Sequence, residues 1–277
     1  MIPRAAAGFV SALALTAARP ELVAAQLLQA QPARYLLTTE AADARAVWVN
    51  PAGLARSVEA SVGADVTAER SGGGARLQQF GVTLLSRNFA AGWSHDSYGG
   101  ASGSADNYVV GTGLGDSLLS IGAARRWYRG RTGDTAWDLA LRARVAPILD
   151  ASVVWRNIGS PTVRDSIYYA SIIPALGVHA RDGRMGAAVE LDMRTSLGTV
   201  REIRAGASIA FGPHFRACLR GEFSPSFDRR GFTVAITWAA AKSRSTLVTI
   251  LPADASSIDA VGAAGAVVAT PEAGSRR

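Results

Sequence analysis

Long segments in which apolar and polar residues alternate constrain this chain of 277 residues more than any other feature of its sequence. Between residues 57 and 238 such segments recur, each about 9 to 12 residues long, against an average of about five or six for ordinary strands. A period of two indicates a β-strand with one apolar and one polar face. The segment 203–211 shows it well: Ile203, Ala205, Ala207, Ile209 and Phe211 alternate with Glu202, Arg204, Gly206 and Ser208. The sequence therefore predicts an all-β fold.

Two architectures produce this alternation. In a soluble β-sandwich the polar faces meet water, whereas in a membrane β-barrel they line a wet lumen and the apolar faces meet lipid. Segment length favours the barrel, because a tilted transmembrane strand needs about 9 to 11 residues. Aromatic residues near segment ends fit the girdles of such a barrel: Trp127, Tyr128, Trp137, Phe211, Phe223, Phe232 and Trp238. We expect an antiparallel transmembrane β-barrel of about 12 to 14 strands over residues 56–251, with the soluble sandwich as the alternative.

Charged residues in the middle of these strands are the main candidates for function, because in a barrel they face the lumen. They are Asp138, Arg142, Arg144, Asp150, Arg156, Glu190, Asp192, Arg194, Glu202, Arg204, Arg216, Arg220 and Glu222. Two hypotheses remain open: the charges form ion pairs that fill a narrow barrel, or part of them lines a solute path or holds a plug.

The first 25 residues have the features of a cleavable export signal. Arg4 precedes the apolar run 5–18, and Val23-Ala24-Ala25 offers small residues for cleavage after Ala25. The alternative is a buried N-terminal helix of a cytosolic protein. Beyond this run, no apolar stretch reaches the 18 or so uncharged residues of a membrane helix, so a helical membrane protein is excluded.

Composition narrows the function further. The formal charge is +7, and Lys242 is the only lysine, so nearly all the positive charge is arginine. Those arginines are interleaved with apolar residues and not clustered, so nucleic acid binding is not expected. Cys218 is the only cysteine, which rules out an internal disulfide.

Searches for catalytic patterns find little. His95, His179 and His214 belong to no metal-binding motif, and no Gly-x-Ser-x-Gly sequence occurs. The glycines 111, 113 and 115 lack the Lys-Ser/Thr of a phosphate loop and indicate a thinned strand. A small buried thiol is favoured over a reactive one at Cys218, although Arg216 and Arg220 share its face. We expect no enzyme, no metal and no cofactor.

Turns divide the chain into strands of defined order. Asp182-Gly183 and Gly212-Pro213 make tight connections, whereas 195–199 and 224–230 are longer. Because the short turns of outer-membrane barrels are periplasmic, the Asp182-Gly183 end is expected to face the periplasm. Residues 246–251 could form one more strand, and residues 252–277, rich in Ala, Gly and Ser, are predicted to be a flexible tail.

Asn50-Pro51-Ala52-Gly53 separates the N-terminal segment from the strands. Taken alone it is a turn, since proline restricts Asn50 to extended conformations and Gly53 permits a reversal.

In its context, the run 43–55 (DARAVWVNPAGLA) resembles the N-terminal signature of the long-chain fatty acid transporter superfamily, especially its PorV/PorQ-like branch. Arg156-Asn157-Ile158-Gly159 is similar to the end of a mid-chain strand in that family, and the run 204–232 is similar to its last hairpins. Residues 229–236 also resemble the assembly signal of outer-membrane barrels. Such signals normally end in an aromatic residue, here Trp238, so either Trp238 ends the last strand of the barrel or a further strand follows.

The resemblance implies a barrel of 14 strands around a plug, here residues 26–55, with Asn50, Pro51 and Gly53 as its hinge. It implies export by the general secretory route to the outer membrane of a Gram-negative-type cell, and outer-membrane lipids as partners. The function it implies is the passage of small or hydrophobic solutes; the alternatives are a PorV-like partner or shuttle for secretion-system proteins and a structural surface barrel.

Overall fold

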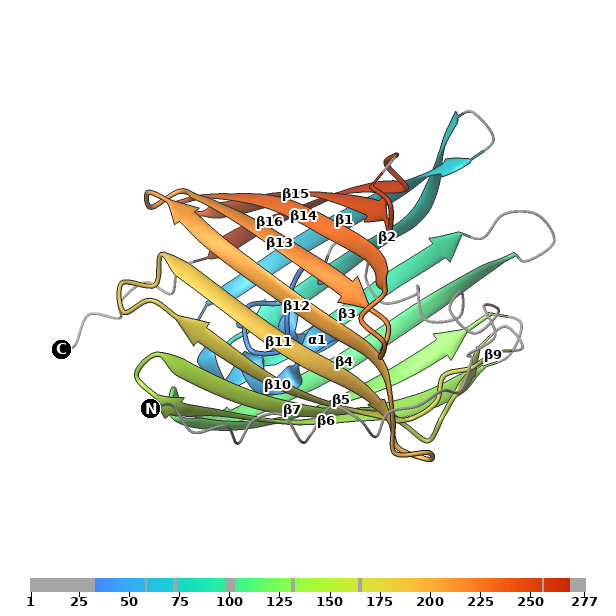
Figure 1. Cartoon of the computed structure of the whole chain (residues 1–277), viewed down its shortest axis with the longest axis horizontal. Coiled ribbons are helices and arrows are strands. Elements are labelled where there is room, and N and C mark those ends of the chain that lie inside the picture. The colour runs from blue at the N-terminus through green and yellow to red at the C-terminus, as the bar shows by residue number, and fades with distance from the viewer. Residues whose placement is uncertain are drawn as a thin grey trace, which may run out of the picture.

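The fold is a single closed sheet. The structure, a computed structural model, describes residues 33–57, 59–71, 74–97, 103–130, 133–163, 166–255 and 257–269. In these residues fourteen antiparallel strands form a closed barrel (Figure 1). The predicted all-β antiparallel barrel is confirmed, and the sandwich alternative is wrong because the sheet closes on itself. The predicted signal 1–25 and the start of the predicted plug, 26–32, lie outside the described residues.

Each strand pairs with the next in the chain, with one interruption between β7 and β10. The barrel strands are β1 (Ala60–Ser71), β2 (Gly74–Ser86), β3 (Phe89–Ser97), β4 (Ser104–Gly115), β5 (Leu119–Arg129), β6 (Asp134–Ala146), β7 (Leu149–Ile158), β10 (Ser171–His179), β11 (Met185–Arg194), β12 (Thr199–Phe211), β13 (Phe215–Phe223), β14 (Arg229–Ala240), β15 (Ser243–Pro252) and β16 (Ala260–Ala269). Between β7 and β10, the short strands β8 (Thr162–Val163) and β9 (Ser166–Ile167) form a separate hairpin. Pairing of β1 with β16 closes the barrel, so the sheet has no free edge.

The two faces of the sheet differ as the alternation predicts. On β6, Trp137 and Leu139 point outward and are 45% and 44% exposed, while Asp138 between them points into the lumen and is 1% exposed. Most of the aromatic residues near segment ends also lie outside. Tyr128 is an exception: it is buried in the lumen and stacks on Tyr168 of the loop 159–170, with ring centroids 6.0 Å apart. Its prediction as a girdle residue is wrong.

The two ends of the barrel differ in their connections. At the short-turn end the strands are joined through residues 87–88, 116–118, 147–148, 180–184, 212–214 and 241–242. At the long-loop end lie longer connections, among them 159–170 and 253–259. β1 begins and β16 ends at the short-turn end, since Ala60 pairs with both Ser86 and Ala269. Which end faces the periplasm stays a prediction.

The C-terminal part corrects the sequence analysis. The barrel was predicted to end at Leu251 and residues 252–277 to be a tail, but Ala260–Ala269 form β16, which pairs with β15 and β1. The segment AVGAAGAVVA lacks polar residues to alternate with, so its periodicity is invisible. Ladder hydrogen bonds come from the main chain, so small side chains do not prevent pairing. Residues 270–277 of the predicted tail lie outside the described residues.

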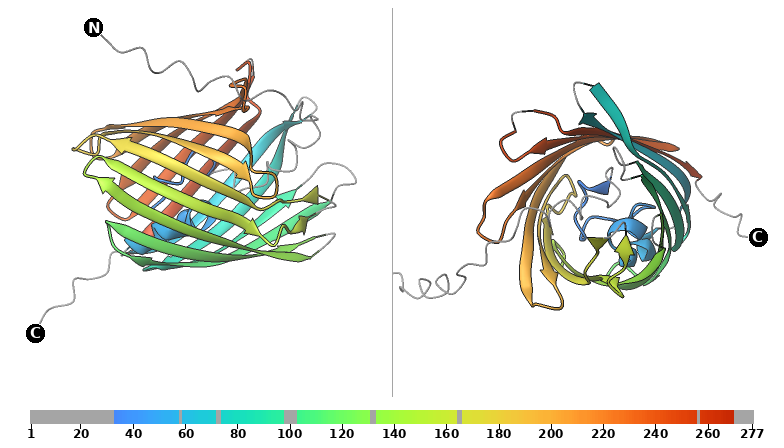
Figure 2. Two further views of the ribbon diagram at one scale, coloured as in Figure 1. Left: turned by 60° about the horizontal axis from the view of Figure 1, so that its bottom comes forward. Right: turned by 90° about the vertical axis from the view of Figure 1, so that its right-hand side faces the viewer.

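Residues 33–57, called here the lumen segment, lie inside the barrel (Figure 2). They contain α1 (Ala46–Val49) and the 3₁₀ helix η4 (Pro51–Arg56). Neither helix, nor any other among the described residues, is long and apolar enough to cross a membrane.

We expect a chain that stops at residue 255 to lose its closed barrel, because β1 and β15 would both be left with a free edge. The measurement is heat-modifiable mobility on a gel, which folded barrels show. A chain that ends at Ala269, and so keeps all the strands described, is the control. Retention of the mobility shift by the shorter chain would show that β16 is dispensable.

Candidate functional site

Asn50 and Pro51 organise the lumen segment. Asn50 is fully buried and extended (φ −153°, ψ 97°), as a residue before proline prefers, and Pro51 occupies the first turn of η4. The Asn50 side-chain oxygen accepts a hydrogen bond from the Ala52 amide at 3.0 Å, which caps η4. Its amide nitrogen donates to the Thr38 carbonyl at 2.7 Å. Asn50 therefore ties the beginning of the segment to its end.

Gly53 lies where the segment crosses itself. A Cβ atom at this position would be 2.0 Å from the Ala41 carbonyl oxygen, so only glycine fits. The predicted hinge residues Asn50, Pro51 and Gly53 thus all lie in the turn that folds the segment compactly within the barrel.

Four wall arginines hold the lumen segment through its main chain. Each points inward from its strand and donates to a carbonyl oxygen: Arg126 to Trp48 (3.0 Å), Arg142 to Ala41 (3.1 Å), Arg156 to Val49 (2.6 Å) and Arg220 to Leu36 (3.0 Å). Irregular backbone leaves carbonyls without partners, and inside a barrel these need donors from the wall. Arginine suits this task because its fork can bind a carbonyl and a carboxylate at once.

Wall carboxylates balance these arginines. Asp138 lies 2.7 Å from the Arg126 guanidinium, and both side chains are almost completely buried. Asp150 pairs with Arg142 at 3.3 Å. Glu222 accepts a hydrogen bond of 2.8 Å from Nε of Arg34, which belongs to the lumen segment itself. The ion pairs of Arg126 and Arg142 therefore fix these two side chains in the orientations that reach the carbonyls.

Arg204 is the centre of a second group of charges. Its guanidinium contacts Glu190 at 2.7 Å, Asp192 at 2.9 Å and Glu202 at 2.9 Å. The other oxygen of Glu190 accepts the Thr38 amide of the lumen segment at 2.9 Å. In this cluster a wall carboxylate, Glu190, accepts a hydrogen bond from the segment, whereas the four wall arginines described above donate hydrogen bonds to it.

The predicted lumen charges do not all belong to one network. Those that are buried in contact with each other or with the lumen segment are Asp138, Arg142, Asp150, Arg156, Glu190, Asp192, Arg204, Arg220 and Glu222, with Glu202 at their edge. Arg144 and Arg216 lie nearer the short-turn end, where Arg216 donates to Ser208 and to the Gly183 carbonyl. Arg194 is separate: it points to the long-loop end, over the Tyr169 ring.

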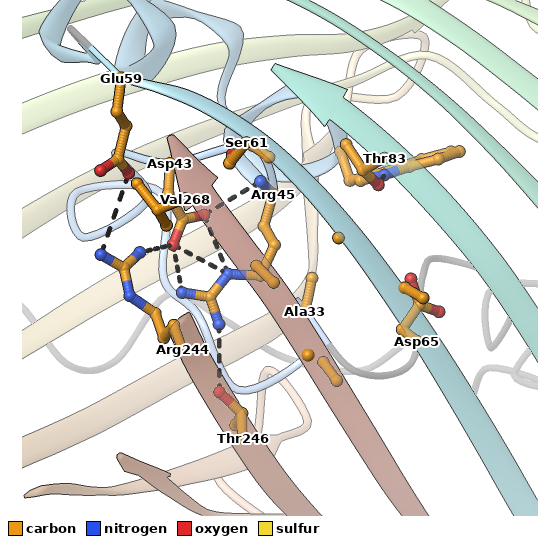
Figure 3. Close-up of a pocket in the computed structure, with 17 residues that line it drawn as sticks. Ala33, Asp43, Arg45, Glu59, Ser61, Asp65, Thr83, Arg244, Thr246 and Val268 are labelled. Atoms are coloured by element: carbon orange, nitrogen blue, oxygen red, sulfur yellow. Dashed lines mark hydrogen bonds and ion pairs between the residues drawn. The ribbon is translucent and has the colours of Figure 1, made fainter. Parts of the chain in front are cut away.

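A different cluster joins the lumen segment to the β1, β15 and β16 side (Figure 3). Asp43 of the segment binds Arg244 of β15 at 2.7 Å and the neighbouring Arg45 Nε at 2.9 Å, and Arg244 lies 4.0 Å from Glu59. Burial raises the pKa of Asp43, opposed mainly by Arg244, and burial lowers the pKa of Arg45 to about 10. Here, within the part of the chain that the structure describes, the contacts between the lumen segment and the wall join side chains, and none of them reaches a carbonyl of the segment.

Two cavities border this Asp43 cluster. One, of about 880 Å³, is a vestibule open at the short-turn end, with Glu40, His179 and Arg216 among its lining residues. The other, of about 50 Å³, lies between Trp48, Ala44 and the small residues of β1 and β16. Asp43, Arg45, Glu59 and Arg244 line both, so the cluster separates them.

Sequence reasoning missed the glycines that make room for the lumen segment. Gly113 of β4 and Gly122 of β5 face each other in the ladder. A Cβ atom on Gly122 would lie 2.2 Å from the Pro51 carbonyl carbon, and one on Gly113 would lie 2.5 Å from the Ala55 nitrogen. The signal was the broken alternation around residues 111–115, which indicated a thinned strand but not what fills the space.

Among the described residues, no group of three His, Cys, Asp or Glu side chains is placed to hold a metal ion. Cys218 is a free, buried thiol on the inner face of β13.

Comparison with known proteins supports the fold. No protein-family model and no curated protein matches the chain. Among solved structures, the Ralstonia pickettii toluene transporter TbuX is 12% identical over 82% of this chain and 93% of its own, with a TM-score of 0.53. A deltaS2 mutant of the monoaromatic hydrocarbon channel TodX, a Pseudomonas putida protein, is 11% identical over 82% and 94%, with a TM-score of 0.53. At these identities the likeness shows a shared barrel fold, and it does not single out the PorV/PorQ-like branch.

Replacing Gly122 by valine is expected to displace η4 from the wall, because the new side chain would overlap Pro51. The barrel should still form, and the lumen segment should be cut faster in limited proteolysis, by about tenfold if the local stability falls by about 1.4 kcal/mol. Gly265→Ala is the control, since a Cβ atom there meets nothing within 4 Å. Equal cleavage rates in both variants would contradict close packing at Gly122.

Proposed function

We propose that this protein spans the outer membrane and passes small, mainly hydrophobic solutes, with the lumen segment as its plug. The observation that carries the proposal is a closed barrel with an apolar outer surface around a segment held by wall side chains. Barrels described as a toluene transporter and a monoaromatic hydrocarbon channel share this fold, which supports the same class of solute here. Such a chain is exported, in agreement with the signal predicted for residues 1–25.

The solute path is proposed to follow the β1, β15 and β16 side of the lumen. On β5, β6 and β7, which lie across the lumen from this side, and on β13, arginines bind the main chain of the plug, so that separation there would leave several buried carbonyls unpaired. On the β15 side the links are contacts between side chains, of Asp43 with Arg244 and of Tyr35 and Arg45 with Thr246. The Asp43 pair can re-form elsewhere or be solvated by the vestibule. The small cavity there is lined by Trp48, Ala44 and Ala266 beside the charged Asp43 cluster, and its apolar part suits hydrophobic solutes.

A second function is favoured by the density of the buried contacts. A plug held by four arginines, and a loop 159–170 that packs Tyr168 on Tyr128 at the long-loop end, also suit a barrel that stays closed. In that case the protein would be a PorV-like partner or shuttle in protein secretion. Cross-linking in cells followed by mass spectrometry tests this: no stable protein partner would exclude the second function.

Deletion of residues 34–54 is expected to raise the conductance of the barrel in planar bilayers, because this removes most of the plug and its links to the wall. Heat-modifiable mobility of the deleted chain shows whether the barrel has folded. A folded barrel whose conductance equals that of the full chain would contradict the plug.

The proposed path predicts a distinct effect of Arg244→Gln. Removing the charge releases Asp43 from the wall while the four arginine contacts stay, so entry of a small aromatic hydrocarbon into liposomes should rise several-fold. Arg184→Gln is the matched control, because Arg184 also lines the vestibule but is exposed and pairs only with Asp182 among the described residues. If neither variant changes uptake, or both change it equally, the path along β15 is wrong.

A further inference from the structure

Arg125 is an arginine on the outer, lipid-facing side of the barrel. Its neighbours Ala124 and Arg126 are 1% and 5% exposed and point into the lumen, so Arg125 points outward with Ile121 and Trp127. It lies toward the long-loop end of β5, which ends at Arg129. An arginine on this face is unusual, because contact of a charge with lipid tails is unfavourable unless the side chain reaches the headgroup region.

Two tryptophans hold the Arg125 side chain. Trp127 follows it on the same face of β5, and Trp137 is its direct partner in the ladder with β6. The guanidinium carbon lies 5.3 Å from the ring centroid of each. Tryptophan collects at the level of the lipid headgroups, so this pair places the guanidinium at the depth of lipid phosphates and restricts its movement through cation–π contacts.

The charge of Arg125 has no counter-ion in the part of the chain that the structure describes. Among the described residues, no carboxylate lies within 4.0 Å of it, and its buried Nε has no hydrogen-bond partner. The nearby outward carboxylate, Asp106, is engaged by His95 Nδ1 at 2.9 Å and Trp93 Nε1 at 3.2 Å and faces Arg129 across the ladder. The outer surface around Arg125 is therefore positive.

We propose that Arg125, Trp127 and Trp137 form a binding site for the phosphate of an anionic lipid in the leaflet at the long-loop end. The planar guanidinium donates to two phosphate oxygens, and the indole rings fix its plane. The acyl chains lie along the apolar face below, where Ile121 and Leu139 are 52% and 44% exposed. The site rests on the proposed membrane location but not on any passage of solutes.

The test is native mass spectrometry of the full chain, stripped of lipid in a non-ionic detergent and titrated with phosphatidylglycerol. We expect one lipid bound more tightly than the rest, and a loss of affinity of about fivefold or more in Arg125→Gln. Trp137→Leu should weaken the same lipid. Arg70→Gln removes an exposed arginine of β1 at the same, long-loop end of the barrel, and Trp238→Leu removes an exposed outer tryptophan of β14 at the opposite end; both should bind as the wild type does.

Several results would overturn the site. One is unchanged affinity in Arg125→Gln and Trp137→Leu; another is equal loss in the two control variants. Equally tight binding of diacylglycerol, or displacement of the lipid by an equal concentration of inorganic phosphate, would also exclude a lipid phosphate as the occupant. Heat-modifiable mobility confirms that each variant is folded. A barrel that binds lipid here but conducts nothing would overturn the proposed function and leave this site intact.

Discussion

The need to pair the carbonyl groups of an irregular segment inside a closed barrel governs much of this structure. A buried carbonyl left without a donor costs about 1 to 3 kcal/mol, and a segment of turns and one-turn helices has many of them. The wall meets this need with inward arginines on β5, β6, β7 and β13. Their charges in turn require carboxylates, which explains why acids such as Asp138 and Asp150 occur on the inner face of the same strands.

The shape of the lumen follows the same requirement. Arginine reaches a carbonyl only if the segment lies close to the wall, and this closeness depends on glycine at the inner positions of β4 and β5. Gly113 and Gly122 form a shallow bed for η4, and Trp48 packs over the glycine at position 92 of β3. In the lumen, glycines of the wall therefore leave room for the segment, and arginines of the wall supply the hydrogen bonds that hold it.

The inner and outer faces of the barrel wall differ in polarity and in what they contact. The inner side is polar and fixes the lumen segment, whereas the outer side is apolar except near its long-loop end, where Arg125 and Asp106 occur among aromatic residues. The Asp43 cluster stands apart because it joins the segment to the wall through side chains alone and borders open space. The segment is therefore held less firmly at the Asp43 cluster than where arginines bind its carbonyl groups.

The sequence by itself determined the class of fold, because a period of two assigns alternate side chains to opposite faces of a strand without regard to distant contacts. It also marked 50–53 as a turn and drew attention to charges within the strands, but it did not single out Arg126, Asp96 or Arg244. It did not identify β16, whose Ala and Gly residues have no polar partners to alternate with. Only the tertiary structure decided that Arg126 and Arg156 bind carbonyls of the lumen segment, that Gly113 and Gly122 lie beneath it, and that Tyr128 faces inward onto Tyr168. These contacts join residues far apart in the chain, and closure of the barrel, which no local pattern records, is what brings them together.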